Sequence, residues 1–218
     1  MIPLRSSEPH YSRASVTLVI ILVNVLVFIY ELSLPSWARN NFIALHGIVP
    51  ARLQLSSIVT SMFIHGGFLH ILGNMWFLWI FGRGVEDLLG HAKYLVFYLT
   101  CGIAAALAHI LLNAGSPVPT IGASGAIAGV MGAYLVKFPR AHIATLVFIF
   151  IFITTVDIPA FILLLYWFAM QFFSGVGSIG YSQASSGDVA WFAHVGGFLA
   201  GMALILLLPT RQRVRSWN

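Results

Sequence analysis

Apolar residues fill six stretches of this chain, and short polar segments separate them. A helix needs about 20 mostly apolar residues to cross a hydrocarbon core that is about 30 Å thick. Each stretch approaches that length, so the pattern predicts an all-α membrane protein with six membrane-spanning helices. Their approximate bounds are 16–34, 68–85, 94–113, 122–137, 157–174 and 189–208.

The run 141–156 is also apolar, and it leaves the start of the fifth helix open. In one interpretation that helix begins earlier and contains Asp157. In the other, the run is a seventh short segment, which changes the topology. Pro159 favours a break, because proline cannot donate the backbone hydrogen bond of a helix interior.

Basic residues gather on one side of the predicted membrane. Cytoplasmic loops of membrane proteins carry an excess of Lys and Arg, so we predict that both termini are cytoplasmic. The loops 35–67, 114–121 and 175–188 then face outward. The predicted cytoplasmic side holds Arg5, Arg13, Arg83, Lys93, Lys137, Arg140, Arg211, Arg213 and Arg215, and the other side holds Arg39 and Arg52.

Composition agrees with a protein that is solvated by lipid. The 218 residues are 59% hydrophobic and 8% charged, whereas soluble domains have about 25% charged residues. The net charge of +5 comes from basic residues scattered between apolar runs, which argues against nucleic-acid binding. We predict a cytoplasmic N-terminal segment 1–15, a membrane domain 16–208 and a basic cytoplasmic tail 209–218.

Four polar side chains interrupt the apolar spans, where a polar group is costly and by default marks a function. They are His70 and Asn74 in the second span, Ser124 in the fourth and His194 in the sixth. All three helices run inward from the outer face, and the four residues lie near their starts. The fourth span is short, about 24 Å of helix, so it is expected to begin below the outer surface. The four groups can then meet at one depth.

Small residues repeat at helical spacing on the fourth and sixth spans, and such stripes let helix backbones approach closely. The serine-bearing and histidine-bearing helices are therefore predicted to be neighbours. The fourth span carries Gly122, Gly125, Gly129 and Gly132, and the sixth carries Ala190, His194, Gly197 and Gly201.

Ser124 lies between two glycines in GASGAIAG, where a loop passes into a helix. Free backbone N–H groups at such a junction can hold an oxyanion. His194 can act as a general base, and His70 and Asn74 share a helix face. Simpler explanations stay open here, because a serine can bond to its own helix and the other three can tie helices together.

A zinc site built from His65, His70 and His194 is the competing chemistry, since three histidines can hold a catalytic metal. The sequence has no HExxH pattern and few intramembrane acids, so a metal mechanism lacks its usual general base. We therefore predict no metal ligands and no cofactor.

Four segments resemble the rhomboid intramembrane serine proteases. They are HGGFLHILGN at 65–74, GRGVEDLLG at 82–90, GASG at 122–125 and AHVGGFLAG at 193–201. The first, third and fourth occur in the family's order and on the expected helices, and the second resembles the junction between the family's second and third helices. The resemblance covers roughly residues 14–210 and implies a six-helix rhomboid-like bundle.

The resemblance also implies roles for single residues. Ser124 would be the nucleophile and His194 the base, with no third acidic member. The oxyanion site would use Asn74, His70 and the backbone N–H of Ser124, with Gly122 beside them. Glu86 would be a hydrogen-bonding anchor, and the helix packing would rest on Gly125, Gly129, Gly132, Gly197 and Gly201.

Two positions depart from the family pattern. Ser56-Ser57 stands where members often have a Trp-Arg pair in the first outer loop. Ala128 stands where many members have an aromatic residue that packs on the catalytic histidine. These departures leave the loop packing and the orientation of His194 open.

The predicted function is that of an intramembrane serine endopeptidase that cleaves transmembrane protein substrates in the lipid bilayer of a prokaryotic plasma membrane. The alternative is a catalytically silent rhomboid-like protein that binds and escorts membrane clients, and the presence of both Ser124 and His194 argues against it. A channel or transporter would need polar residues through the whole membrane thickness, whereas here they cluster at the outer end.

Overall fold

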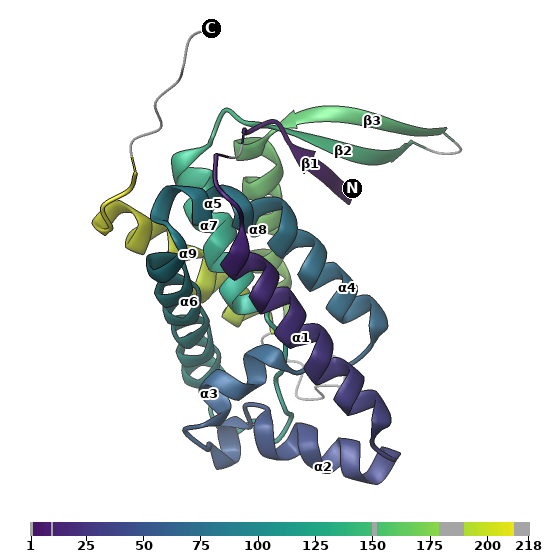
Figure 1. Ribbon diagram of the computed structural model, residues 1–218. Coiled ribbons are helices and arrows are strands. Elements are labelled where there is room, and N and C mark those ends of the chain that lie inside the picture. Colours follow the sequence, from purple (N-terminus) through teal and green to yellow (C-terminus); the bar gives the residue numbers. More distant parts are fainter. Residues whose placement is uncertain (1, 10, 150–151, 179–189, 212–218) are drawn as a thin grey trace, which may run out of the picture.

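The computed structural model describes residues 2–9, 11–149, 152–178 and 190–211. It is a bundle of helices with a small sheet at one end (Figure 1). The helices are α1 (Ser15–Ser33), α2 (Ser36–His46), η1 (Pro50–Arg52), α3 (Ser57–Thr60), η2 (Ser61–Phe63), α4 (Phe68–Phe77), η3 (Leu78–Gly82), α5 (Arg83–Leu89), α6 (His91–Leu112), α7 (Ser124–Lys137), α8 (Ala160–Ser178) and α9 (Trp191–Leu207). The strands are β1 (Ile2–Ser6), β2 (His142–Ile149) and β3 (Phe152–Pro159).

In the described part of the chain, three helices, α1, α6 and α8, are long and apolar enough to cross a membrane. A bent pair of helices, Ser57–Phe63 and Phe68–Leu89, passes the same test when its two parts are taken together, and the angle between the parts is 95°. The apolar helices α7 and α9 are shorter. The chain is therefore a multi-pass membrane protein, and the count of six crossings stays a prediction.

Within the run 141–156, residues 142–149 and 152–156 form strands, so the helical interpretations of this run are wrong and the fold is not purely α. β2 and β3 pair as an antiparallel hairpin in which Ala144 lies opposite Asp157, and β1 completes the order β1-β2-β3. Ile, Val, Thr and Phe crowd this run, and these residues favour strands. The fifth long helix, α8, begins only at Ala160, directly after Pro159.

The predicted N-terminal segment 1–15 contributes β1 to this sheet. Ile2 pairs with Leu146 of β2, and the indole N–H of Trp76 on α4 donates to the carbonyl O of Pro3 at 2.5 Å. The start of the chain is thus joined to the helical bundle. The predicted basic tail is described only as far as Arg211, because residues 212–218 lie outside the described part.

The predicted outer loops contain more structure than a loop. The first, 35–67, holds α2, η1, α3 and η2. It is joined to the second, 114–121, because Ile48 and Thr120 exchange two backbone hydrogen bonds of 2.9 and 2.8 Å. The third was predicted at 175–188, but residues 175–178 belong to α8, which ends at Ser178. Residues 179–189 lie outside the described part.

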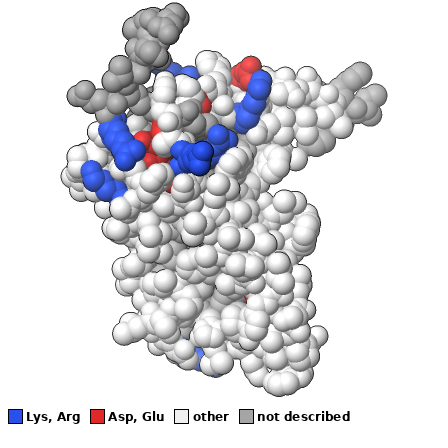
Figure 2. All heavy atoms as spheres, viewed as in Figure 1, with Lys and Arg blue, Asp and Glu red and all other residues white. Residues whose placement is uncertain are grey.

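Lys and Arg side chains gather at the end of the bundle where α1 begins and the sheet lies, as Figure 2 shows together with Figure 1. Few appear at the opposite end in this view. This asymmetry is the one that the positive-inside argument uses. The cytoplasmic orientation of the basic end remains a prediction.

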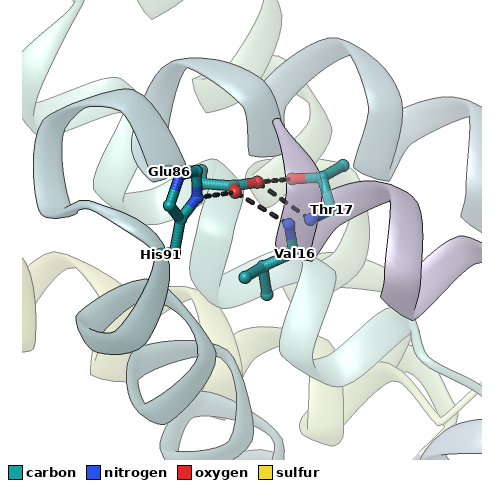
Figure 3. Close-up of polar contacts among 4 residues, drawn as sticks. All are labelled: Val16, Thr17, Glu86 and His91. Carbon is teal, nitrogen blue, oxygen red and sulfur yellow. Dashed lines mark hydrogen bonds and ion pairs between the residues drawn. The ribbon is translucent and has the colours of Figure 1, made fainter. Parts of the chain in front are cut away.

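Glu86 on α5 holds the first turn of α1 (Figure 3). Its carboxylate accepts the backbone N–H groups of Val16 and Thr17, both at 2.8 Å, and the Thr17 hydroxyl at 2.6 Å. His91 Nδ1 lies 2.7 Å from the same carboxylate. The first N–H groups of a helix lack intrahelical partners and favour negative charge. Glu86 is fully buried. Through these hydrogen bonds it caps α1 from a neighbouring helix.

The backbones of α7 and α9 touch at their glycines. A Cβ atom on Gly201 would overlap the carbonyl O of Gly129, and one on Gly197 would overlap that of Gly125. Gly132 lies equally close to the backbone of α9. Helices can approach this closely only where side chains are absent, so the glycines set the distance between α7 and α9.

Candidate active site

The close packing of α7 and α9 brings a serine and a histidine together. Ser124 is the first residue of α7, and His194 lies in the first turn of α9. The Oγ of Ser124 lies 2.7 Å from Nε2 of His194, which is normal for a hydrogen bond with a hydroxyl donor. A hydroxyl bonded to an imidazole is the arrangement that activates a nucleophile.

The other side of the imidazole faces α8. Nδ1 of His194 lies 2.5 Å from Oε1 of Gln171, and both residues are buried. The ring centroid of Trp167 lies 5.7 Å from that of His194, and the centroid of Trp191 lies 6.5 Å away. Sequence reasoning missed both Gln171 and Trp167. A signal was present, because Gln171 is a polar residue inside the apolar span 157–174.

Gly122 lies two residues before Ser124, close to the side chains of His70 and Asn74. Its φ is +120°, a conformation that other residues rarely adopt. A Cβ atom here would lie 2.7 Å from Nε2 of His70 and 3.5 Å from Nδ2 of Asn74. The N–H of Gly122 donates to the carbonyl O of Ser61 at 2.9 Å. Because Gly122 has no side chain, His70 and Asn74 can lie close to its backbone. Its own N–H is already bonded and is not available to a ligand.

Three hydrogen-bond donors lie beside the serine. The first backbone bond that closes a turn of α7 runs from Ile127 N to Ala123 O, so the Ser124 N–H precedes it and has no helical acceptor. Nδ2 of Asn74 is buried and has no partner among the described residues. Nδ1 of His70 accepts a long bond of 3.4 Å from the Gly66 N–H, which leaves its Nε2 to carry the proton.

These side chains line one cavity of about 1150 Å³. Its polar groups come mainly from α4, α7, α8 and α9, with Ser61, His109 and Thr120 also in the lining, and much of the remaining wall is apolar. The lining includes His70, Asn74, Ser124, Gln171 and His194. Such a cavity, with a few convergent polar groups, is typical of a ligand or substrate site.

A further contact between histidines bears on the zinc alternative. The rings of His65 and His70 lie 5.1 Å apart by their centroids. Among the described residues, no group of three His, Cys, Asp or Glu side chains is placed to hold a metal ion. The zinc alternative thus finds no ligand geometry in the described part of the chain.

The family model for the Rhomboid domain matches residues 52–211, which is more than half of the chain. This chain belongs to the rhomboid family. The match contains the segments that carry Asn74, Ser124 and His194, so these residues of the cavity lie inside the rhomboid domain.

Three similar proteins show how far the likeness extends. Human presenilin-associated rhomboid-like protein, mitochondrial, is 30% identical over 127 residues, which are 57% of this rhomboid and 33% of the human chain. Rhomboid protein 1, mitochondrial, of Saccharomyces cerevisiae is 36% identical over 96 residues, or 42% and 28%. Rhomboid protease GluP of Bacillus subtilis is 38% identical over 78 residues, or 36% and 15%. The matched part is a third or less of each relative.

The expected prokaryotic plasma membrane is not borne out by these relatives. The human and yeast proteins are mitochondrial by name, and only the third of the three is bacterial. Membership of the rhomboid family and the apolar helices establish an integral membrane protein. They do not distinguish one membrane from another.

Ser57 and Ala128 lie at the two places where this rhomboid departs from the family pattern. Ser57 is buried at the start of α3, and its hydroxyl donates to the carbonyl O of Gln54 at 2.7 Å. Ala128 is fully buried, and the aromatic rings beside His194 are those of Trp167 and Trp191. The histidine is therefore held mainly from α8.

Proposed function

We propose that this rhomboid is an intramembrane serine endopeptidase in which Ser124 is the nucleophile and His194 the general base. The observation that carries the proposal is the 2.7 Å contact between Ser124 Oγ and His194 Nε2. Both atoms belong to residues that line the cavity. A serine that served only its own helix would bond to a carbonyl one turn back, not to an imidazole on another helix.

The reaction follows from this contact. Neutral His194 takes the hydroxyl proton of Ser124 at Nε2 while Oγ forms a bond to the carbonyl carbon of the substrate. The resulting tetrahedral intermediate collapses when the C–N bond breaks and Nε2 returns the proton to the leaving amine. Water, activated by the same imidazole, then hydrolyses the acyl-enzyme and frees Ser124.

The three donors beside the serine suit the negative charge of that intermediate. They are the Ser124 N–H, Nδ2 of Asn74 and Nε2–H of His70. Nδ2 of Asn74, which is buried and has no partner within the described part of the chain, supports this role most strongly, because a buried donor without an acceptor is costly unless a ligand provides one. Donors that bond only to the developing charge lower the barrier to reaction.

Membrane proteins are the proposed substrates. The cavity lies within a bundle of apolar helices, and one of the similar proteins is named a rhomboid protease. A peptide bond inside a regular helix is shielded by its own hydrogen bonds. The substrate helix therefore has to unwind locally before Ser124 can reach a carbonyl carbon.

Reconstitution with a single-span model substrate tests the proposal. We expect cleavage by the wild type and none by Ser124→Ala, whereas Thr100→Ala should retain full activity. Thr100 is a matched control, because its hydroxyl is exposed on α6 and bonds to its own helix at Val96 O. Substrate that binds but stays uncut with the wild type would favour the escort alternative.

A further inference from the structure

Gln171 on α8 lies where a third member of the catalytic unit would be. Its Oε1 is 2.5 Å from Nδ1 of His194, on the opposite side of the ring from Ser124. We propose that Gln171 is a positioning residue that fixes the tautomer and the orientation of His194. This inference rests on the proposed function, and it keeps the expectation of no third acidic member, because Gln171 is a neutral amide.

The hydrogen bond decides which ring nitrogen carries the proton. An amide oxygen only accepts hydrogen bonds, so Nδ1 must be the donor. In a neutral imidazole the other nitrogen is then an acceptor. Nε2 consequently presents its lone pair to the Ser124 hydroxyl, which is the state that a general base requires. Among the described residues, Gln171 is the one hydrogen-bond partner of His194 Nδ1, so it alone selects this tautomer over the other.

Gln171 also suits the charge that forms during the reaction. When Nε2 takes the serine proton, the imidazole becomes positive, and the Gln171 oxygen accepts a stronger, charge-assisted hydrogen bond. The amide itself stays neutral. A carboxylate buried at this depth would carry a large desolvation cost whenever the histidine was neutral. An amide therefore orients the base at a lower cost to folding.

Packing holds the amide in place. Trp167 lies four residues before Gln171 on α8, so the two share a helix face, and the indole lies against the same imidazole. Gln171 is 9% exposed and His194 is 7% exposed, so water has little access to compete for the bond. Trp167 and Gln171 thus both contact the ring from α8.

Two substitutions separate positioning from simple packing. Gln171→Leu keeps a similar volume and removes the acceptor, whereas Gln171→Glu keeps an acceptor oxygen at the same distance along the side chain. Met170→Leu is the control, because Met170 is the neighbouring residue and is half exposed. Substrate cleavage gives kcat and KM, and the rate of reaction with a fluorophosphonate across pH reports on Ser124 and its base without the unwinding of a substrate helix.

We expect Gln171→Leu to lower kcat and the labelling rate about tenfold, the effect of losing one hydrogen bond of roughly 1.4 kcal/mol, with KM unchanged. Gln171→Glu should restore the rate and move the acid limb of the pH profile to higher pH, because a carboxylate favours the protonated imidazole. The other titratable groups facing His194 are His70 and His109, and both variants leave them in place. Met170→Leu should behave as the wild type.

A spectroscopic measurement keeps the inference independent of activity. Nitrogen NMR of histidine-labelled protein, assigned with His194→Ala, should show His194 protonated at Nδ1 in the wild type. The signal should change tautomer in Gln171→Leu. A wild type that cleaves and labels while Gln171→Leu keeps its rate, pH profile and tautomer would overturn the inference alone. A wild type that never reacts would overturn the proposed function, and the NMR spectrum would still decide on Gln171.

Discussion

Gly201 of α9 lies directly against the carbonyl O of Gly129 on α7, with no space for a Cβ atom between them. This contact lies several residues beyond the Ser124–His194 pair on the same two helices. A change in the distance between α7 and α9 would therefore affect both the stability of the bundle and the alignment of Ser124 with His194.

Gly201→Ala is expected to destabilise the protein by about 1–3 kcal/mol, since an added methyl group must push the backbones apart. Gly73→Ala is the matched control, because a Cβ atom there meets nothing within 4 Å. Alanine also favours helix over glycine, so this control should be neutral or stabilising. Thermal unfolding in detergent measures both variants. Equal midpoints for the two would contradict the packing argument.

Glu86→Gln should lower the stability by at least about 1.5 kcal/mol, because a buried charged acceptor of several hydrogen bonds at a helix start is neutralised. The loss should appear as earlier opening of α1 in hydrogen exchange at Val16 and Thr17. Asp157→Asn, an exposed acid on β3, is the control and should leave both measurements unchanged. Unaltered exchange at the start of α1 in Glu86→Gln would refute the capping role.

Sequence patterns predicted most of the helical bundle, because long apolar runs have few alternatives to a helix in a membrane. They failed at 141–156, where an apolar run is equally compatible with a buried helix and with strands. Only its Ile, Val, Thr and Phe content, with Pro159 at the end, pointed to strands. Pairing with β1, far away in the sequence, could not be read from local patterns.

The polar residues of the candidate site were easier to find than their partners. Ser124, His194, His70 and Asn74 stood out because they interrupt apolar spans, and the glycine stripes indicated which helices meet. Gln171 also interrupts a span, but no neighbouring motif drew attention to it. Its contact with His194 depends on how α8 rotates against α9, and periodicity alone does not determine that rotation.

Asn74→Ala should lower kcat by about 10²–10³ and leave KM close to its wild-type value, because its free Nδ2 bonds only to the developing charge. Stability should change little, since that atom has no partner among the described residues. Asn24→Ala is the control, because its Nδ2 bonds to Ile20 O within α1. A loss confined to KM, or unfolding of Asn74→Ala, would favour a purely structural role.

Cleavage of a substrate helix should fall near the membrane face opposite the basic end of the bundle. The candidate site lies at the first turns of α7 and α9, away from that end. Helix-weakening residues near the cut should raise the rate, because they lower the cost of unwinding. Mass spectrometry of the products locates the cut, and replacing those residues with leucine tests the unwinding. A cut at the basic end would contradict the predicted topology.

Reaction of the detergent-solubilised protein with a fluorophosphonate, followed by peptide mass spectrometry, tests the Ser124–His194 pair most directly. We predict a single adduct on Ser124 in the wild type, a rate at least about 10³-fold lower in His194→Ala, and an unchanged rate in His142→Ala, whose imidazole is exposed on β2. No adduct on Ser124, or an equal rate in His194→Ala, would contradict the account.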